Sequence, residues 1–123
     1  MGVEYSLLNQ TKREQLTFAY MPVGRKREIA GDPASAALVA WYMLEHPQDD
    51  IRFVSGSDGE WPFKVGNRDE AFGYLDITNS LIEQLVVEGI LRDDGLLWQD
   101  EEEPELYLRD IRNIWLEDTK GRV

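Results

Sequence analysis

The stretch from Asp32 to His46 reads DPASAALVAWYMLEH and predicts the helix around which the fold is built. Asp32 is a favourable N-cap, and Pro33 suits the first helical position, where its missing N–H costs no hydrogen bond. Between residues 34 and 44 only Ser35 is polar, so this helix should be apolar nearly all round. Such a helix must be covered on most sides, which makes it the expected centre of the core.

Three further features limit what this helix can do. Ala36, Ala37 and Ala40 form a face of small residues that another element can approach closely. Pro47 ends the helix, because proline disfavours helical geometry in the residue before it. The helix is too short to cross a bilayer, which needs about 20 apolar residues.

Composition predicts a folded chain with one domain. The chain has 123 residues, of which 42% are hydrophobic, and it contains 4 Trp, 5 Tyr and 4 Phe, enough to build a core. We expect a single domain over residues 1–116 and a frayed polar tail over residues 117–123. There is no cysteine, which excludes disulfides and thiolate metal sites. No signal peptide or membrane span is recognisable, so a cytoplasmic location without membrane contact is expected.

The charge of the chain is strongly negative and unevenly distributed. Asp and Glu number 24 against 13 Lys and Arg, which gives a net charge of −11. Residues 1–31 are slightly basic, and the remainder carries the whole acidic excess. An acidic body repels phosphate backbones and attracts basic partners, although the same charge also serves plain solubility.

The N-terminal part of the chain predicts a β-hairpin. Residues 3–9 and 16–20 are short runs of aliphatic and aromatic residues, separated by a polar turn over residues 10–14. Leu16, Phe18 and Tyr20 should share one face of the second strand, which Pro22 ends. A basic connection with a helical turn over residues 23–31 then leads to the apolar helix.

The middle of the chain predicts a strand, an irregular segment and a second helix. Residues 51–55 alternate as a strand, whereas residues 56–75 show no firm pattern and are either functional or hide an element. The second helix should begin at Asp76 or Thr78. Gly89 suits the left-handed position after its end, with Ile90 reaching back to Leu85 in a Schellman motif.

The C-terminal part predicts a second hairpin. Asp94-Gly95 is typical of a tight turn between residues 90–92 and residues 96–98. An acidic loop follows over residues 100–105, and residues 106–115 fit both a strand and a helix, with a strand over 105–110 preferred. The resulting order ββαβαββ predicts the α+β class, a mainly antiparallel sheet with two principal helices.

The run LIEQLVVEGIL over residues 81–91, leading into Asp94-Gly95, resembles the last helix and wing of a winged-helix domain. This resemblance covers about a third of the chain and implies DNA reading by the helix. The sequence departs from that pattern, because the polar face carries Glu83, Gln84 and Glu88 where a recognition helix presents basic residues or amides.

Residues for catalysis or metal binding are sparse. His46 is the only histidine, and no nucleophile-elbow motif surrounds Ser35, Ser55 or Ser57. Asp58 with Glu60 is a possible acid–base pair, but nothing in the sequence indicates their separation. Neither residues 58–60 nor residues 100–103 have the spacing of a known calcium loop. The sequence therefore favours a non-enzymatic protein without a cofactor or metal.

The aromatic residues and carboxylates together predict a protein-binding surface. Loop tryptophans beside carboxylates suit an interface hot spot with an acidic rim, although each Trp could equally seal an edge of the core. The residues in question are Trp61, Phe63, Trp98, Asp100, Glu101, Glu102 and Glu103. The leading hypothesis is an acidic protein-binding module from a bacterial or phage cytoplasm. Its specific form is an immunity or inhibitor protein that masks a basic partner such as a nuclease.

Two alternatives remain open from the sequence. The first is a nucleic-acid-binding regulator that uses the basic N-terminal group, Lys12, Arg13, Arg25, Lys26 and Arg27, or its winged-helix-like half. The second is a small hydrolase or metal-dependent enzyme. A homodimer that pairs the basic N-terminal third with the acidic remainder is compatible with all of these functions.

Overall fold

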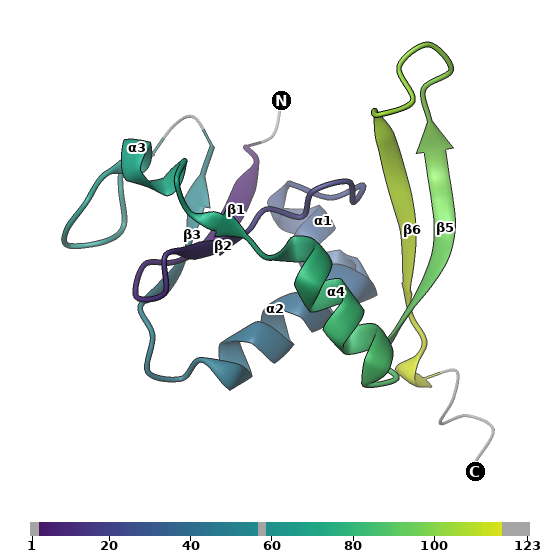
Figure 1. Cartoon of the computed structure of the whole chain (residues 1–123). Coiled ribbons are helices and arrows are strands. Elements are labelled where there is room, and N and C mark those ends of the chain that lie inside the picture. The colour runs from purple at the N-terminus through teal and green to yellow at the C-terminus, as the bar shows by residue number, and fades with distance from the viewer. Residues whose placement is uncertain (1–2, 57–58, 117–123) are drawn as a thin grey trace.

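The computed structural model describes residues 3–56 and 59–116 (Figure 1). The predicted tail at 117–123 and two candidate residues, Ser57 and Asp58, lie outside the described residues. The elements in chain order are β1 (Tyr5–Asn9), β2 (Glu14–Leu16), α1 (Lys26–Gly31), α2 (Pro33–Glu45), β3 (Ile51–Ser55), α3 (Arg68–Ala71), β4 (Leu75–Asp76), α4 (Thr78–Val87), β5 (Leu91–Gln99) and β6 (Tyr107–Asn113).

The fold is of the broad α+β kind, and it differs in detail from the expected order. Two short elements, α3 and β4, were not predicted, whereas the helical turn expected within residues 23–31 forms the helix α1. The strands form two sheets, one with the order β3-β1-β2-β4 and one made of β5 and β6 alone. The first sheet is mixed, because β4 runs parallel to β2 while the other pairs are antiparallel.

The first hairpin forms, but its second strand is shorter than expected. Leu7 pairs with Leu16, and the strand ends there. The prediction that Phe18 and Tyr20 continue the face of Leu16 is wrong, since both have left-handed φ angles of 58° and 64°. The chain leaves the sheet because the Thr17 N–H donates to the Thr78 hydroxyl at the start of α4. Phe18 then turns into the core, and Tyr20 points outward.

Helix α2 forms as predicted and supplies the centre of the main core. The Asp32 carboxylate accepts a hydrogen bond from the Ser35 N–H at 3.1 Å, which caps the first turn. Leu38 and Tyr42 are buried, and the helix contacts α1, α4 and β6. The core cluster consists of Leu7, Leu16, Phe18, Met21, Ile29, Ala34, Leu38, Tyr42, Leu81, Ile82, Leu85, Leu91 and Ile111.

The cover over α2 is less complete than its composition predicts. Ala40, Met43 and Leu44 are exposed, and Ala36 and Val39 are only partly buried. One side of this apolar helix therefore faces solvent. No helix in the described part of the chain is long and apolar enough to cross a membrane.

Residues 56–75, which showed no firm pattern, contain α3 and β4 and close a second, smaller core. Phe63 and Tyr74 pack there with Leu8 and Val54, on the sheet face opposite to α2. The Arg68 guanidinium donates to the carbonyl oxygens of Ser55 and Gly59, which ties α3 to the end of β3. The segment thus has structure that depends on contacts distant in sequence.

Helix α4 ends in the predicted Schellman motif. The Ile90 N–H donates to the Leu85 carbonyl at 3.0 Å, the Gly89 N–H donates to the Val86 carbonyl at 3.1 Å, and Gly89 has a φ of 79°. Both hydrogen bonds satisfy carbonyls that the helix end would otherwise leave without partners.

The second hairpin is longer than expected and turns elsewhere. The prediction of a tight turn at Asp94-Gly95 is wrong, because β5 runs through both residues. Gly95, with a φ of 96°, lies in a β-bulge between the pairs Asp93–Ile111 and Leu96–Arg109. The turn is made by the acidic loop, and the ambiguous segment after it is a strand, β6.

Candidate functional site

The β5–β6 hairpin projects from the rest of the molecule (Figure 1). Only its base is anchored in the core, through Leu91 and Ile111, which are 1% and 8% exposed. All residues from 92 to 99 are exposed. An isolated two-stranded hairpin is at best marginally stable in water, so a projecting hairpin with bare faces invites contact with another molecule.

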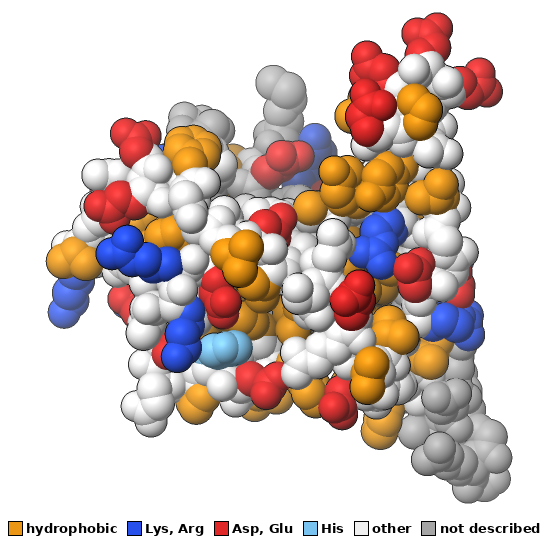
Figure 2. Space-filling view, in the orientation of Figure 1, with side chains coloured by type: hydrophobic (Ala, Val, Ile, Leu, Met, Phe, Trp, Pro, Cys, Tyr) orange, Lys and Arg blue, Asp and Glu red, His pale blue; other side chains and the backbone are white. Residues whose placement is uncertain are grey.

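Apolar side chains are exposed along the upper part of the hairpin. Leu96, Leu97 and Trp98 are 53%, 53% and 50% exposed, and Leu106 after the turn is 48% exposed. Leu96 pairs with Arg109 and Trp98 pairs with Leu108, and these neighbouring residues of β6 point to opposite faces, so exposed apolar side chains lie on both faces of the hairpin. Figure 2 shows a band of orange hydrophobic side chains on the hairpin below its tip. We call Leu96, Leu97, Trp98 and Leu106 the apolar belt.

The tip of the hairpin is acidic and held in one shape. Oδ1 of Asp100 accepts hydrogen bonds from the N–H groups of Glu102 and Glu103 at 2.8 and 2.9 Å, and the Asp100 N–H donates to the Leu106 carbonyl. The remaining tip carboxylates have no ion pair within the described residues: Glu101, Glu102, Glu103 and Glu105. They form the red cluster at the tip in Figure 2.

The lower part of the hairpin is held by charge pairs. The Arg109 guanidinium donates to Asp93 at 2.9 Å and to the Asn79 amide oxygen of α4 at 2.7 Å. The Gly95 N–H donates to the Asp93 carboxylate at 2.9 Å. These two donors hold the pKa of Asp93 below its usual value, with the Gly95 amide as the larger cause. The β-bulge at Gly95, where a turn was expected, is thereby held by the side chains of Asp93 and Arg109.

The structure divides the predicted partner-binding residues between two places. Trp98, Asp100 and Glu101–Glu103 lie on the hairpin, whereas the other two aromatic residues lie in the segment between β3 and α3, on the far side of the molecule in Figure 1. Phe63 is buried in the second core, and Trp61 packs on it with ring centroids 5.0 Å apart. The Trp61 indole N–H also donates to the Val65 carbonyl, so this pair closes a loop.

The basic N-terminal residues do not form one patch. Lys12 and Arg13 lie in the turn after β1, whereas the backbone of Arg25 forms an isolated β-bridge with Glu4, which precedes β1. The two groups are therefore separated by about the length of that strand, roughly 17 Å. At this separation the two groups are not neighbours, so they do not combine into a single basic patch.

The winged-helix-like arrangement of a helix followed by a hairpin is present in α4, β5 and β6. The turn of the hairpin is the acidic tip, however, and Glu83 and Glu88 are exposed on the helix. Both of these surfaces repel a phosphate backbone.

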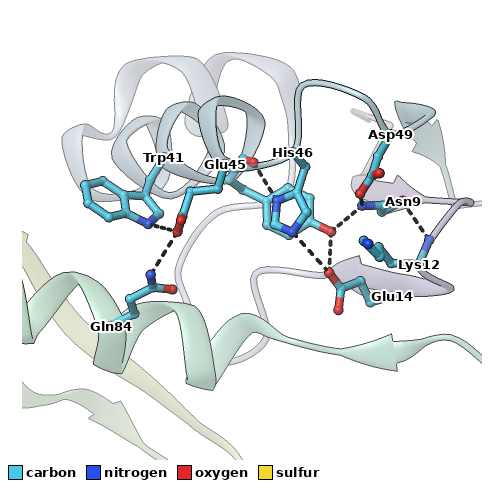
Figure 3. Close-up of polar contacts among 9 residues, drawn as sticks. Asn9, Lys12, Glu14, Trp41, Glu45, His46, Asp49 and Gln84 are labelled. Carbon is cyan, nitrogen blue, oxygen red and sulfur yellow. Dashed lines mark hydrogen bonds and ion pairs between the residues drawn. The ribbon is translucent and has the colours of Figure 1, made fainter.

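The only histidine belongs to a polar cluster at the end of α2 (Figure 3). Nδ1 of His46 lies 2.8 Å from the Tyr42 carbonyl oxygen, and Nε2 lies 3.8 Å from the Glu14 carboxylate. The Tyr42 hydroxyl donates to Glu14 at 2.7 Å and accepts from the buried Asn9 amide at 2.8 Å. Burial raises the pKa of the Tyr42 hydroxyl, and its hydrogen bond to Glu14 raises it further. The amide of Asn9 also donates to Asp49, so the cluster joins β1, β2 and the end of α2.

Two of the serines considered as nucleophiles, Ser35 and Ser55, are engaged elsewhere. Ser35 donates to Asp32 at the other end of α2, about 16 Å along the helix from His46. The Oγ of Ser55 accepts from Arg68 at the far end of β3. Among the described residues, no group of three His, Cys, Asp or Glu side chains is placed to hold a metal ion. The cluster around His46 therefore fits a structural role.

The sequence indicated Trp98 and the acidic loop but not the other members of the apolar belt. Leucine is also a common core residue, so the residue type of Leu96, Leu97 and Leu106 did not indicate exposure. The turn predicted at Asp94-Gly95 also placed Leu96 and Leu97 far from the true tip of the hairpin. The signal that could have found them is three consecutive apolar residues in one strand of a hairpin that has no second layer. Comparisons with protein-family models, with curated proteins and with solved structures gave no match for this chain.

Proposed function

We propose that this protein is a non-enzymatic, acidic protein-binding module and that the β5–β6 hairpin is its contact surface. One observation carries the proposal: a projecting hairpin exposes the apolar belt on both faces, directly beneath a tip of carboxylates without ion pairs in the described chain. Apolar residues within an acidic rim are the anatomy of a protein–protein hot spot.

The chemistry of this surface defines its partner. An apolar cleft with a basic rim would accept Trp98 and the neighbouring leucines, while the tip carboxylates would pair with Lys or Arg. The charge would accelerate association, and burial of the belt would supply most of the affinity. The specific form of the proposal is an immunity or inhibitor protein that masks the basic substrate-binding face of a toxic enzyme such as a nuclease.

The experiment is a capture from nuclease-treated lysate of the native host, using the whole chain as bait over a salt series. We expect one basic protein to be retained and then released as salt rises. Trp98→Ala should abolish its retention. The triple change Glu101→Gln, Glu102→Gln and Glu103→Gln should slow association about tenfold at low salt and flatten its salt dependence. Asp100 is left intact because its carboxylate shapes the tip.

Matched controls separate this surface from general effects of charge and aromatic content. Glu60→Gln, Asp69→Asn and Glu88→Gln remove the same charge from exposed positions outside the hairpin. Trp115→Ala removes a Trp that is 53% exposed outside the two strands. Partner binding should persist in both controls. If the hairpin variants retain the partner as well as the parent does, or if only nuclease-sensitive material is retained, the proposal is wrong.

A further inference from the structure

A second apolar surface lies away from the hairpin, between the edge of the first sheet and the helices α1 and α2. It is a groove with a volume of about 530 Å³. Its lining residues are Tyr5, Lys26, Ile29, Ala30, Ala36, Val39, Ala40 and Phe53. All but Lys26 are apolar or aromatic.

The groove exists because α2 covers only part of the sheet. Tyr5, Leu7 and Phe53 point to the same face, since Leu7 pairs with Phe53 and side chains alternate along a strand. Leu7 is 2% exposed beneath α2, whereas Phe53 on the edge strand β3 is 41% exposed. The alanines that α1 and α2 present here are too short to fill the space. A concave apolar surface of this size is typical of small-molecule sites, which span about 300–1,000 Å³.

The cation among the lining residues is Lys26, which Arg25 and Arg27 flank in the sequence. Four arginines elsewhere form ion pairs with aspartates: Arg52, Arg92, Arg109 and Arg112. In the described part of the chain, Lys26 and its neighbours Arg25 and Arg27 have no ion pair. The adjacent Glu28 carboxylate is engaged, because it accepts hydrogen bonds from the N–H groups of Gly24 and Arg25.

Lys26 and Tyr5 come from α1 and β1, which both contribute to the lining of the groove. The ring of Tyr5 belongs to the aromatic part of this lining, and Lys26 is its only charged residue. The lining residues therefore combine one cation with an apolar trough.

We propose that this groove binds a small apolar monocarboxylate of the fatty-acid type. Its hydrocarbon chain would lie on Ile29, Val39 and Phe53, and its carboxylate would pair with the Lys26 ammonium. The two ends of such a ligand match the two kinds of lining that the groove has. A second copy of this chain is a poorer occupant, since each copy carries a net charge of −11 and the two would repel.

The test uses decanoate as the probe and decanol as its uncharged counterpart, with binding to the full chain measured by calorimetry. We expect saturable decanoate binding and binding of decanol about tenfold weaker, because a charge-assisted hydrogen bond is lost. Lys26→Gln should weaken decanoate about tenfold and leave decanol unchanged. Ala40→Trp, at an exposed position of the lining, should fill the groove and abolish binding of both compounds.

The controls are Lys64→Gln and Met43→Trp, exposed positions outside the lining, and both should bind decanoate like the parent. Absence of saturable binding, equal binding of decanol, or full decanoate binding by Lys26→Gln would overturn the proposal. So would a homodimer, detected by light scattering, that Ala40→Trp dissociates, because the groove would then hold a second copy. Trp98→Ala should bind decanoate normally, so this test is independent of the hairpin.

Discussion

The rings of Tyr20 and Tyr107 stack with their centroids 4.3 Å apart and their planes 3° from parallel. The backbone next to this stack is also joined, since the Arg109 N–H donates to the Tyr20 carbonyl at 2.7 Å. Tyr20 lies beyond the end of β2, in a segment that has already left the first sheet, and its backbone has a left-handed φ of 64°. The hairpin is therefore attached to the body by this contact higher on β6 as well as by its buried base and by the hydrogen bond from Arg109 to Asn79.

Removing the stack should loosen the upper hairpin without unfolding the base. Tyr107→Ala should destabilise this part by about 0.5–1.5 kcal/mol beyond the lost burial, the usual contribution of an aromatic pair. Amide hydrogen exchange of residues 96–99 should become faster, while exchange at Leu91 stays slow. Leu106→Ala, at a neighbouring residue outside the stack, is the control. Equal exchange in Tyr107→Ala and the parent would show that the stack does not hold the hairpin.

Asn9 and Tyr42 should be energetically coupled. Asn9 is 0% exposed, and Asn9→Ala removes the partner of the Tyr42 hydroxyl and of the Lys12 N–H, for a loss of about 1–3 kcal/mol. The double variant with Tyr42→Phe should then cost less than the sum of the single changes, by about 0.5–3 kcal/mol. Urea unfolding of the four proteins measures this coupling. As a control, the losses of stability from Asn9→Ala and Leu97→Ala should add. If the losses from Asn9→Ala and Tyr42→Phe also add, Asn9 and Tyr42 are not coupled.

The bulge should respond to acid through Asp93. Because the Gly95 amide and Arg109 lower the pKa of Asp93 in the folded chain, ionised Asp93 stabilises the fold above its unfolded pKa, about 3.9. This contribution is lost as pH falls through the lower, folded value. We expect the Gly95 amide resonance to shift only below about pH 4. Asp93→Asn should abolish the shift and Asp94→Asn should retain it, whereas a shift in Asp93→Asn would assign it to another group.

Two glycines should respond to alanine with opposite signs. Neither Gly89 nor Gly31 has an atom within 4 Å of an added Cβ, so sterics do not distinguish them. Gly89→Ala must hold a left-handed φ of 79°, which costs about 1–2 kcal/mol. Gly31→Ala lies in α1 and should stabilise the protein by up to about 1 kcal/mol. Thermal unfolding compares the two variants, and a destabilised Gly31→Ala would show that α1 does not require helical geometry there.

The residues of the candidate site show how far sequence alone could go. An acidic run is normally solvated, so the sequence predicts exposure of Glu101–Glu103, whereas Trp98 fits both an interface and an edge of the core. Phe63 was grouped with them because it follows Trp61 and Pro62 in a segment without a helix or strand pattern. Its burial against Leu8 and Val54 follows from the path of residues 59–75 back to the sheet, and no local pattern encodes that path.

By itself, the sequence determined the features that depend on neighbours within a few residues. The Asp32 cap, the apolar length of α2 and the Schellman end at Gly89 follow from interactions and dihedral angles of that range. Tertiary structure decided the rest. Gly95 became a bulge because β6 pairs across it, and the chain leaves β2 at Thr17 because Thr78 binds its amide. The groove remained open because α2 covers β1 but not the edge strand β3. Each of these outcomes joins residues distant in sequence, and a local pattern contains no information about such a partner.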